Sequence, residues 1–150
     1  MGYKVLESQF VTIILVEDDP GHLKLIEKNL RRGGFENPIK VFENGQQALD
    51  YLKRSNDFED HPMNRCILLM DLNMPVMNGV ELLRILKQDN KLRKIPVIIL
   101  TSTDDQREID ECYSLGCNLY MPKPVEFNQF SEVIRQLGLM IGLIAVPSLK

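Results

Sequence analysis

The sequence has few of the residues that build disulfide frameworks or zinc sites. Its three cysteines, Cys66, Cys112 and Cys117, are odd in number and form no CxxC pair. No histidine lies at ligand spacing from them, so a metal site built on cysteine is not expected. Free cysteines that serve as small apolar side chains are typical of a reducing compartment. We therefore expect a cytoplasmic protein.

Long apolar runs and an excess of basic charge are also missing. The apolar run from Leu137 to Val146 contains two glycines and is about half of the ~20 residues that a membrane span needs. No long apolar run follows Met1 to Lys4, which argues against a secretory signal. The net charge of -3 gives no general electrostatic reason to bind DNA or RNA. The sequence predicts no membrane association and no nucleic-acid binding.

What is present is the composition of an ordinary globular domain. The chain has 150 residues, of which 44% are hydrophobic and 26% charged, enough to build one hydrophobic core. Five short apolar segments alternate with five amphipathic ones. This alternation predicts a doubly wound α/β fold, with a five-stranded parallel sheet in the flavodoxin-like order 2-1-3-4-5 and helices on both faces. The expected strands are 12–16, 39–43, 67–70, 96–101 and 118–121.

Capping and turn residues mark the limits of these elements. Asp19 before Pro20 is typical of a helix start with Asp19 as the N-cap, and Gly33-Gly34 ends that helix. The alternating segment 39–43 indicates a strand near a sheet edge. The polar segment 54–65 indicates an exposed loop.

The helix that opens at 102–105 is expected to end at Gly116, and a last helix is expected from about Glu126 to beyond Leu137. The side chains predicted to face the core from the first of these helices are Ile109, Cys112 and Tyr113. We divide the chain into a lead-in (1–11), one domain (12–137) and a helix end with a tail (138–150).

Polar residues follow the apolar strands in a consistent place. Since the carboxyl ends of parallel strands meet at one edge of a sheet, these residues are expected to lie together. Three clustered carboxylates repel one another unless a cation lies between them, and oxygen ligands without cysteine or histidine favour Mg²⁺. A carboxylate can also attack phosphorus to give an acyl phosphate. A lysine ammonium and a hydroxyl would neutralise and bind the phosphoryl oxygens. The residues are Glu17, Asp18, Asp71, Thr101 and Lys123.

Each of these residues alone has a simpler explanation. An aspartate after an apolar strand is more often a turn former or an N-cap. The acidic triplet before Pro20 can be a helix start that the macrodipole favours. Thr101 and Lys123, taken singly, are more often a cap and a solvated charge. Their joint placement at successive strand ends favours a functional site around Asp71.

These motifs resemble the receiver domains of two-component response regulators. The segments that match, in order and in approximate spacing, are 14–19, 69–75, Gly79, 100–102 and Lys123-Pro124. The resemblance implies that Asp71 accepts a phosphoryl group from a histidine kinase and that the protein is not an enzyme, although it takes part in its own phosphorylation and dephosphorylation. It further implies a cis Lys123-Pro124 bond.

The resemblance also assigns roles to the neighbours of Asp71. Asp18 would bind Mg²⁺ directly, with Mn²⁺ or Ca²⁺ as possible substitutes, and Glu17 through water. Asn73 would offer its backbone carbonyl as a further metal ligand. Lys123 would bridge to the phosphoryl oxygen. Thr101 and Tyr120 would form the switch pair, Thr101 moving toward the phosphate and Tyr120 turning inward.

Further details resemble the stand-alone response regulators of cyanobacterial phytochromes. They are the segment 87–103, the long loop at 54–65 and the Val146-Pro147 ending. This resemblance implies a phytochrome-type histidine kinase as partner and a homodimer formed through the last helices and the tail. Where that group has aromatic residues, this chain has the aliphatic segment 138–143. With 26 residues after Pro124, we expect no DNA-binding output domain and signalling through protein–protein contacts.

Other classes of protein share parts of this pattern. Haloacid-dehalogenase-type phosphatases also use a strand-end aspartate, but they place it on the first strand with a second aspartate two residues later, where this chain has Asn73. A pseudo-receiver that acts as a scaffold without phosphorylation is a second alternative, disfavoured by the complete set of site residues. A flavodoxin-like cofactor binder is disfavoured because no phosphate-binding loop follows the first strand.

Overall fold

The fold is a parallel five-stranded sheet between two layers of helices. The computed structural model describes residues 11–54, 65–74, 76–123 and 126–141. The strand order is β2-β1-β3-β4-β5 and every recorded pairing is parallel, as the sequence predicted. The predicted lead-in up to residue 10, most of the 54–65 loop, the tail beyond 141 and the Lys123-Pro124 bond lie outside these residues. The strands are β1 (Thr12–Val16), β2 (Ile39–Phe42), β3 (Cys66–Met70), β4 (Val97–Thr101) and β5 (Leu119–Pro122).

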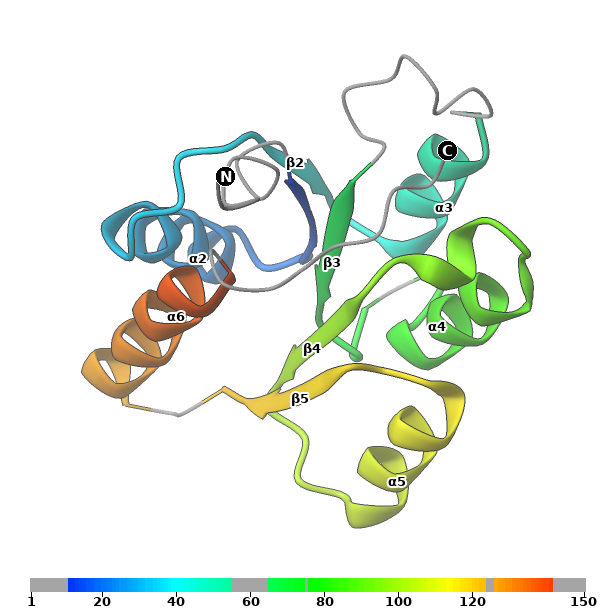
Figure 1. Cartoon of the computed structure of the whole chain (residues 1–150). Coiled ribbons are helices and arrows are strands. Elements are labelled where there is room, and N and C mark those ends of the chain that lie inside the picture. Colours follow the sequence, from blue (N-terminus) through cyan, green and yellow to red (C-terminus); the bar gives the residue numbers. More distant parts are fainter. Residues whose placement is uncertain (1–10, 55–64, 75, 124–125, 142–150) are drawn as a thin grey trace, which may run out of the picture.

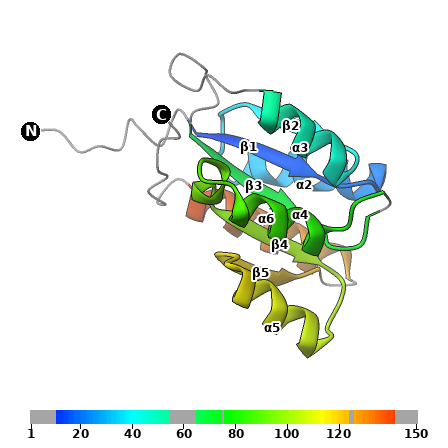
Figure 2. The same ribbon diagram turned by 90° about the vertical axis from the view of Figure 1, so that its right-hand side faces the viewer.

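Helices α2 and α6 cover one face of the sheet, and α3, α4 and α5 cover the other (Figure 1 and Figure 2). A short 3-10 turn, Leu92–Lys94, precedes β4. The three central strands β1, β3 and β4 are buried along their whole length, because helices cover both of their faces. The helices are α2 (Pro20–Arg32), α3 (Gly45–Arg54), α4 (Gly79–Gln88), α5 (Gln106–Leu115) and α6 (Phe127–Ile141).

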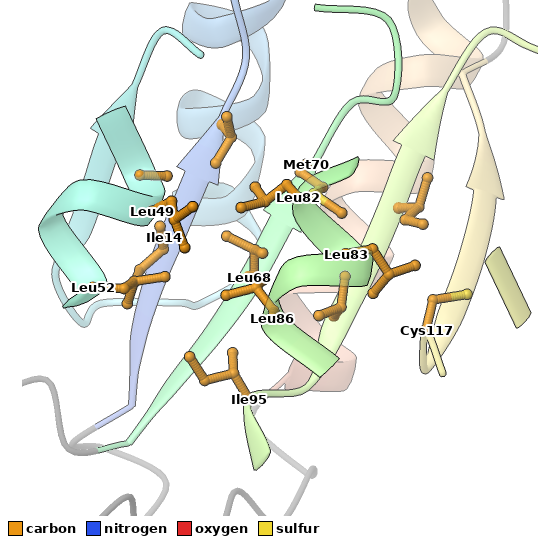
Figure 3. Close-up of a cluster of buried hydrophobic side chains, with 14 of the residues drawn as sticks. Ile14, Leu49, Leu52, Leu68, Met70, Leu82, Leu83, Leu86, Ile95 and Cys117 are labelled. Carbon is orange, nitrogen blue, oxygen red and sulfur yellow. The ribbon is translucent and has the colours of Figure 1, made fainter. Parts of the chain in front are cut away.

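Alternate side chains of the central strands enter two separate hydrophobic layers. Ile14 and Leu68 join the layer under α3, α4 and α5, part of which Figure 3 shows. Ile13 and Ile67 point the other way and join the layer under α2 and α6. The apolar runs are continuous because each strand supplies both layers.

Helices α2 and α6 pack closely at a pair of glycines. A Cβ atom on Gly33 would lie 2.3 Å from the carbonyl oxygen of Arg135, and one on Gly138 would lie 2.9 Å from that of Leu30. Neither helix can carry a side chain at these positions without moving its neighbour. The sequence predicted Gly33 only as the end of a helix, because its contact with α6 depends on tertiary structure.

The helix starts follow the predicted capping chemistry. The Asp19 carboxylate accepts hydrogen bonds from the N–H groups of Gly21 and His22, at 2.8 and 3.1 Å, so it is the N-cap of α2. Gly116 ends α5 in the left-handed region with φ 104°, as a C-terminal cap requires.

The prediction for α5 was wrong for Tyr113, whose side chain is 48% exposed. Of the α5 residues, Cys112 is buried and Ile109 is half-buried. The helix lies beside β5 at the edge of the sheet, so a narrower stripe of it meets the core. The Tyr113 hydroxyl accepts a hydrogen bond from the N–H of Tyr120 at 3.2 Å. It thereby binds a backbone donor of the edge strand that no neighbouring strand can reach.

Among the described residues, no helix combines the length and the apolar character needed to cross a bilayer. The part of the apolar C-terminal run within the structure, up to Ile141, belongs to α6. Leu137 is buried against the sheet, while Leu139 and Met140 are about half exposed.

Candidate functional site

The five strand-end residues picked out by the sequence lie along one edge of the sheet. Glu17 follows β1, Asp71 follows β3, and Thr101 ends β4. The register explains their proximity, because the last residues of β1 and β3, Val16 and Met70, are paired partners. The structure therefore brings together what the order of the strands predicted.

Lys123 is the centre of the site. Its Nζ lies 2.5 Å from Glu17 Oε1 and 3.1 Å from Asp71 Oδ2. All three side chains are buried, with exposures of 4% for Lys123, 2% for Glu17 and 10% for Asp71. The backbone N–H of Lys123 donates to the Thr101 carbonyl at 2.8 Å, which fixes the chain just after β5. One ammonium group thus contacts two buried carboxylates and offsets one of their two negative charges.

A third carboxylate, Asp18, joins these two. Ligand oxygens of Glu17, Asp18 and Asp71 all lie within 4.8 Å of one another, and Asp18 is exposed at the opening of the cluster. Burial raises the pKa of the Glu17 carboxyl above its usual value, while its contact with Lys123 opposes this shift. Three acids beside a single ammonium leave an excess of negative charge, which a divalent cation would neutralise. The donor set, oxygen alone, fits Mg²⁺ or Mn²⁺.

The loop after β3 holds Asp71 in place. Its backbone N–H donates to the Val16 carbonyl at 3.2 Å, which continues the β1–β3 pairing by one residue. The N–H of Asn73 donates to Asp71 Oδ1 at 3.3 Å. Gly79 packs directly behind, and a Cβ atom there would lie 2.6 Å from the Asp71 carbonyl oxygen. The glycine thus allows α4 to begin against the backbone that carries the carboxylate.

The predicted switch pair meets at Thr103 in this structure. Thr101 is fully buried, and its hydroxyl accepts a 3.5 Å hydrogen bond from the Thr103 N–H. The Tyr120 hydroxyl donates to the Thr103 carbonyl at 3.0 Å. Burial raises the pKa of Tyr120 to about 12, so the phenol remains a donor at neutral pH. Both side chains are therefore connected to the segment that follows β4.

His22 also belongs to the site, although the sequence did not predict it. Its Nδ1 lies 3.1 Å from Lys123 Nζ, and its ring packs edge-on against Phe130 with the centroids 5.5 Å apart. A histidine in the first turn of an amphipathic helix carries no motif of its own. The only usable signal was its place three residues after Asp19, on a helix that starts beside the acidic cluster.

Comparison with known proteins agrees with this geometry. Among curated proteins, the chain is 34% identical to a probable methanogenesis regulatory protein, FilR2 of Methanothrix harundinacea, over 87% of this chain and 83% of that protein. It is 32% identical to the response regulator Rcp1 of Synechocystis, over 82% of this chain and 83% of Rcp1.

Solved structures of receiver domains superpose on most of the chain. A response regulator receiver domain from Rhodospirillum rubrum has a TM-score of 0.84 and 46% identity, covering 91% of this chain and 97% of that one. The phosphorylated cyanobacterial phytochrome response regulator RcpA has a TM-score of 0.81 and 26% identity, covering 91% and 98%. The Mn²⁺-bound form of Rcp1 has a TM-score of 0.81 and 25% identity, covering 91% and 99%.

The model of one protein family, the response regulator receiver domain, matches residues 13–135. This range contains β2 to β5, all of β1 except its first residue Thr12, the acidic cluster and Lys123. The chain therefore belongs to the family of response regulator receiver domains, with phytochrome response regulators among its structural neighbours.

Proposed function

We propose that this protein is a response regulator that accepts a phosphoryl group from a histidine kinase on Asp71, with the help of Mg²⁺. The observation that carries the proposal is the buried contact between the Lys123 ammonium and the carboxylates of Glu17 and Asp71. A buried lysine with two carboxylates at a strand-end edge is costly for stability alone. The arrangement suits a site that receives further negative charge.

The residues of the chain divide the chemistry among them. Asp71 is the nucleophile: one carboxylate oxygen forms an O–P bond while the P–N bond of the kinase phosphohistidine breaks, and the departing imidazole nitrogen takes a proton from water. Glu17, Asp18, Asp71 and the Asn73 backbone carbonyl would hold Mg²⁺, which neutralises charge on the phosphoryl oxygens. Lys123 donates to one of those oxygens, and the Thr101 hydroxyl to another.

Signalling would follow from rearrangement of Thr101 and Tyr120. A Thr101 hydroxyl drawn toward the phosphoryl group would give up its bond from the Thr103 N–H. Because the Tyr120 hydroxyl donates a hydrogen bond to the Thr103 carbonyl, Tyr120 would move when Thr103 moves. We propose this pair as the switch that carries phosphorylation to the surface formed by β5 and its flanking helices.

The resemblance to the phytochrome response regulator RcpA supports a phytochrome-type histidine kinase as partner. The free, buried cysteines Cys66, Cys112 and Cys117 support a cytoplasmic location. We also propose a homodimer in which α6 takes part, since Leu139 and Met140 leave apolar surface exposed on its outer side. The protein would act as a phosphoacceptor that signals through protein contacts. The scaffold and phosphatase alternatives remain as outcomes of the experiment below.

The test is phosphorylation by acetyl phosphate, with and without Mg²⁺. We expect one acid-stable, hydroxylamine-labile phosphoryl group per chain in the wild type, only with the metal, and none in Asp71→Asn. A wild type that stays unlabelled while a known receiver is labelled in parallel would contradict the proposal and favour the scaffold. Continuous release of phosphate from unrelated phosphomonoesters would favour a phosphatase.

A further inference from the structure

The Lys123 ammonium has a third contact, which the proposed chemistry does not use. Its Nζ lies 3.1 Å from Nδ1 of His22, in addition to its contacts with Glu17 Oε1 at 2.5 Å and Asp71 Oδ2 at 3.1 Å. An ammonium group carries three hydrogens and no lone pair. Three acceptors therefore match its three donors.

The chemistry of the two groups sets the direction of a hydrogen bond between Lys123 and His22. Because Lys123 can only donate, Nδ1 of His22 must accept, and the proton of the neutral ring then lies on Nε2. The same Nδ1 is 3.9 Å from Glu17 Oε1 and 3.8 Å from Asp19 Oδ2, too long for hydrogen bonds. A proton on Nδ1 would face the ammonium at the shortest of these distances. The geometry thus favours a lone pair directed at Lys123 over an ion pair with the acids.

Two elements hold the ring in this position. The N-cap residue Asp19 accepts from the N–H of His22 itself, which fixes the first turn of α2. On the other side the Phe130 ring of α6 packs against the imidazole at an interplanar angle of 66°. The side chain is nevertheless 43% exposed, so a smaller residue can replace it without opening a buried cavity.

We propose that His22 is a positioning residue that aims Lys123 at the phosphoryl group, an inference that rests on the proposed function. When Asp71 becomes an acyl phosphate, the hydrogen now directed at Asp71 Oδ2 turns to a phosphoryl oxygen. Glu17 and His22 hold the other two hydrogens, so the ammonium keeps its place and orientation. Without His22, a flexible lysine side chain is fixed by one partner fewer at the moment of transfer.

The matched variants are His22→Asn and His22→Leu. The two new side chains branch alike at Cγ, and both lose the ring contact with Phe130. Only asparagine retains an acceptor, its Oδ1, at the position of the histidine Nδ1. Since a hydrogen bond to a charged group changes rate constants by about tenfold or more, we expect His22→Leu to be phosphorylated about tenfold more slowly than the wild type. His22→Asn should stay within about threefold of the wild type, allowing for poorer aim.

Acetyl phosphate is the donor, with labelling followed by intact-protein mass spectrometry at saturating Mg²⁺. His22 also lines a surface hollow together with Leu25 and Phe127, where a kinase can touch it. A small donor needs no such contact, so its rate reports on the site alone. Equal slowing of the Asn and Leu variants would overturn the inference, because the lost feature would then be the ring.

A double-mutant cycle with Lys123→Met tests whether His22 acts through Lys123. We expect His22→Leu to cause no further slowing once the ammonium is gone. The same tenfold loss in the Lys123→Met background would refute the positioning role. If the wild type is labelled and both His22 variants are labelled at the same rate, the positioning role is refuted and the proposed function stands. If the wild type is not labelled, the proposed function itself is refuted. Urea unfolding of each variant confirms that the rates compare folded proteins.

Discussion

Asp18→Asn should stabilise the metal-free protein, although it removes a residue of the functional site. Asp18 faces the carboxylates of Glu17 and Asp71, while Lys123 supplies one positive charge, so the side chain meets a net charge of about -1. At 4.8 Å, the upper limit of their separation, two unit charges repel by about 0.9 kcal/mol in water and about 3.5 kcal/mol at an effective dielectric constant of ~20. Since Asp18 is exposed, the lower value applies. We expect the free energy of unfolding to rise by about 1 kcal/mol.

Magnesium should reverse the order of the two proteins. A cation that binds only the folded state stabilises it by about 2.7 kcal/mol at one hundred times its dissociation constant. The wild type should gain this increment, whereas Asp18→Asn should gain little because it lacks the carboxylate that we propose as a direct ligand. The assay is urea unfolding followed by circular dichroism, with and without MgCl₂ at constant ionic strength, which keeps charge screening equal.

Asp110→Asn is the matched control, an exposed aspartate on α5 that accepts a hydrogen bond from Gln106 at 2.8 Å. It should shift stability by no more than about 0.5 kcal/mol and leave the magnesium increment unchanged. The reasoning would be refuted if Asp18→Asn lowered the stability of the metal-free protein. Retention of the full magnesium increment by that variant would equally refute it, since the cluster would then not be the cation site.

Three further predictions concern packing, pH and assembly. Gly79→Ala places a Cβ atom 2.6 Å from the Asp71 carbonyl oxygen and should lower the free energy of unfolding by about 1–3 kcal/mol in the same urea assay. In the control Gly21→Ala the new Cβ meets only the flexible Asp19 carboxylate, at 3.3 Å, and stability should hardly change. Burial raises the pKa of Glu17, so the folded state holds a proton that the unfolded chain releases. The free energy of unfolding should therefore fall as the pH rises above about 4.5 through the folded-state pKa, and Glu17→Gln should make this fall smaller. The wild type should scatter light as a dimer and Leu139→Glu with Met140→Glu as a monomer, and an unchanged mass would remove α6 from the interface.

The fold was predictable because its strands are buried on both faces. The runs at 12–16 and 67–70 have no alternation of polar and apolar residues, since each side chain enters one of two buried layers. Strands of this kind indicate a parallel sheet covered by helices on both faces. The edge strand β2 alternates in the sequence and is only partly buried in the structure. The prediction that Tyr113 is buried was wrong, because an amphipathic pattern shows which residues share a helix face. It does not show how much of that face the neighbouring strand covers.

The site was predictable only as far as chain order fixes it. Glu17, Asp71 and Lys123 follow strands whose ends must meet, so their contact follows from topology. His22 lies on a helix, and its contact with Lys123 depends on how α2 is oriented about its axis. The approach of Gly33 and Gly138 depends on two helices separated by most of the chain. Neither contact has a local signal in the sequence.

The close glycine contact between α2 and α6 makes the two helices move as one rigid unit. With the Gly33 Cα so close to the backbone of α6 that no methyl group fits between them, the helices cannot slide past each other without a collision of main-chain atoms. A partner that binds the outer side of α6 and shifts this helix would therefore shift α2 with it. The first turn of α2 carries Asp19 and His22, so a displacement of α6 would also move the end of α2 that lies beside Lys123 and Asp71, the proposed phosphoacceptor. If Asp71 is phosphorylated as proposed, a protein that binds α6 more tightly in the phosphorylated form must, by reciprocity, shift the phosphorylation equilibrium of Asp71 by the same factor.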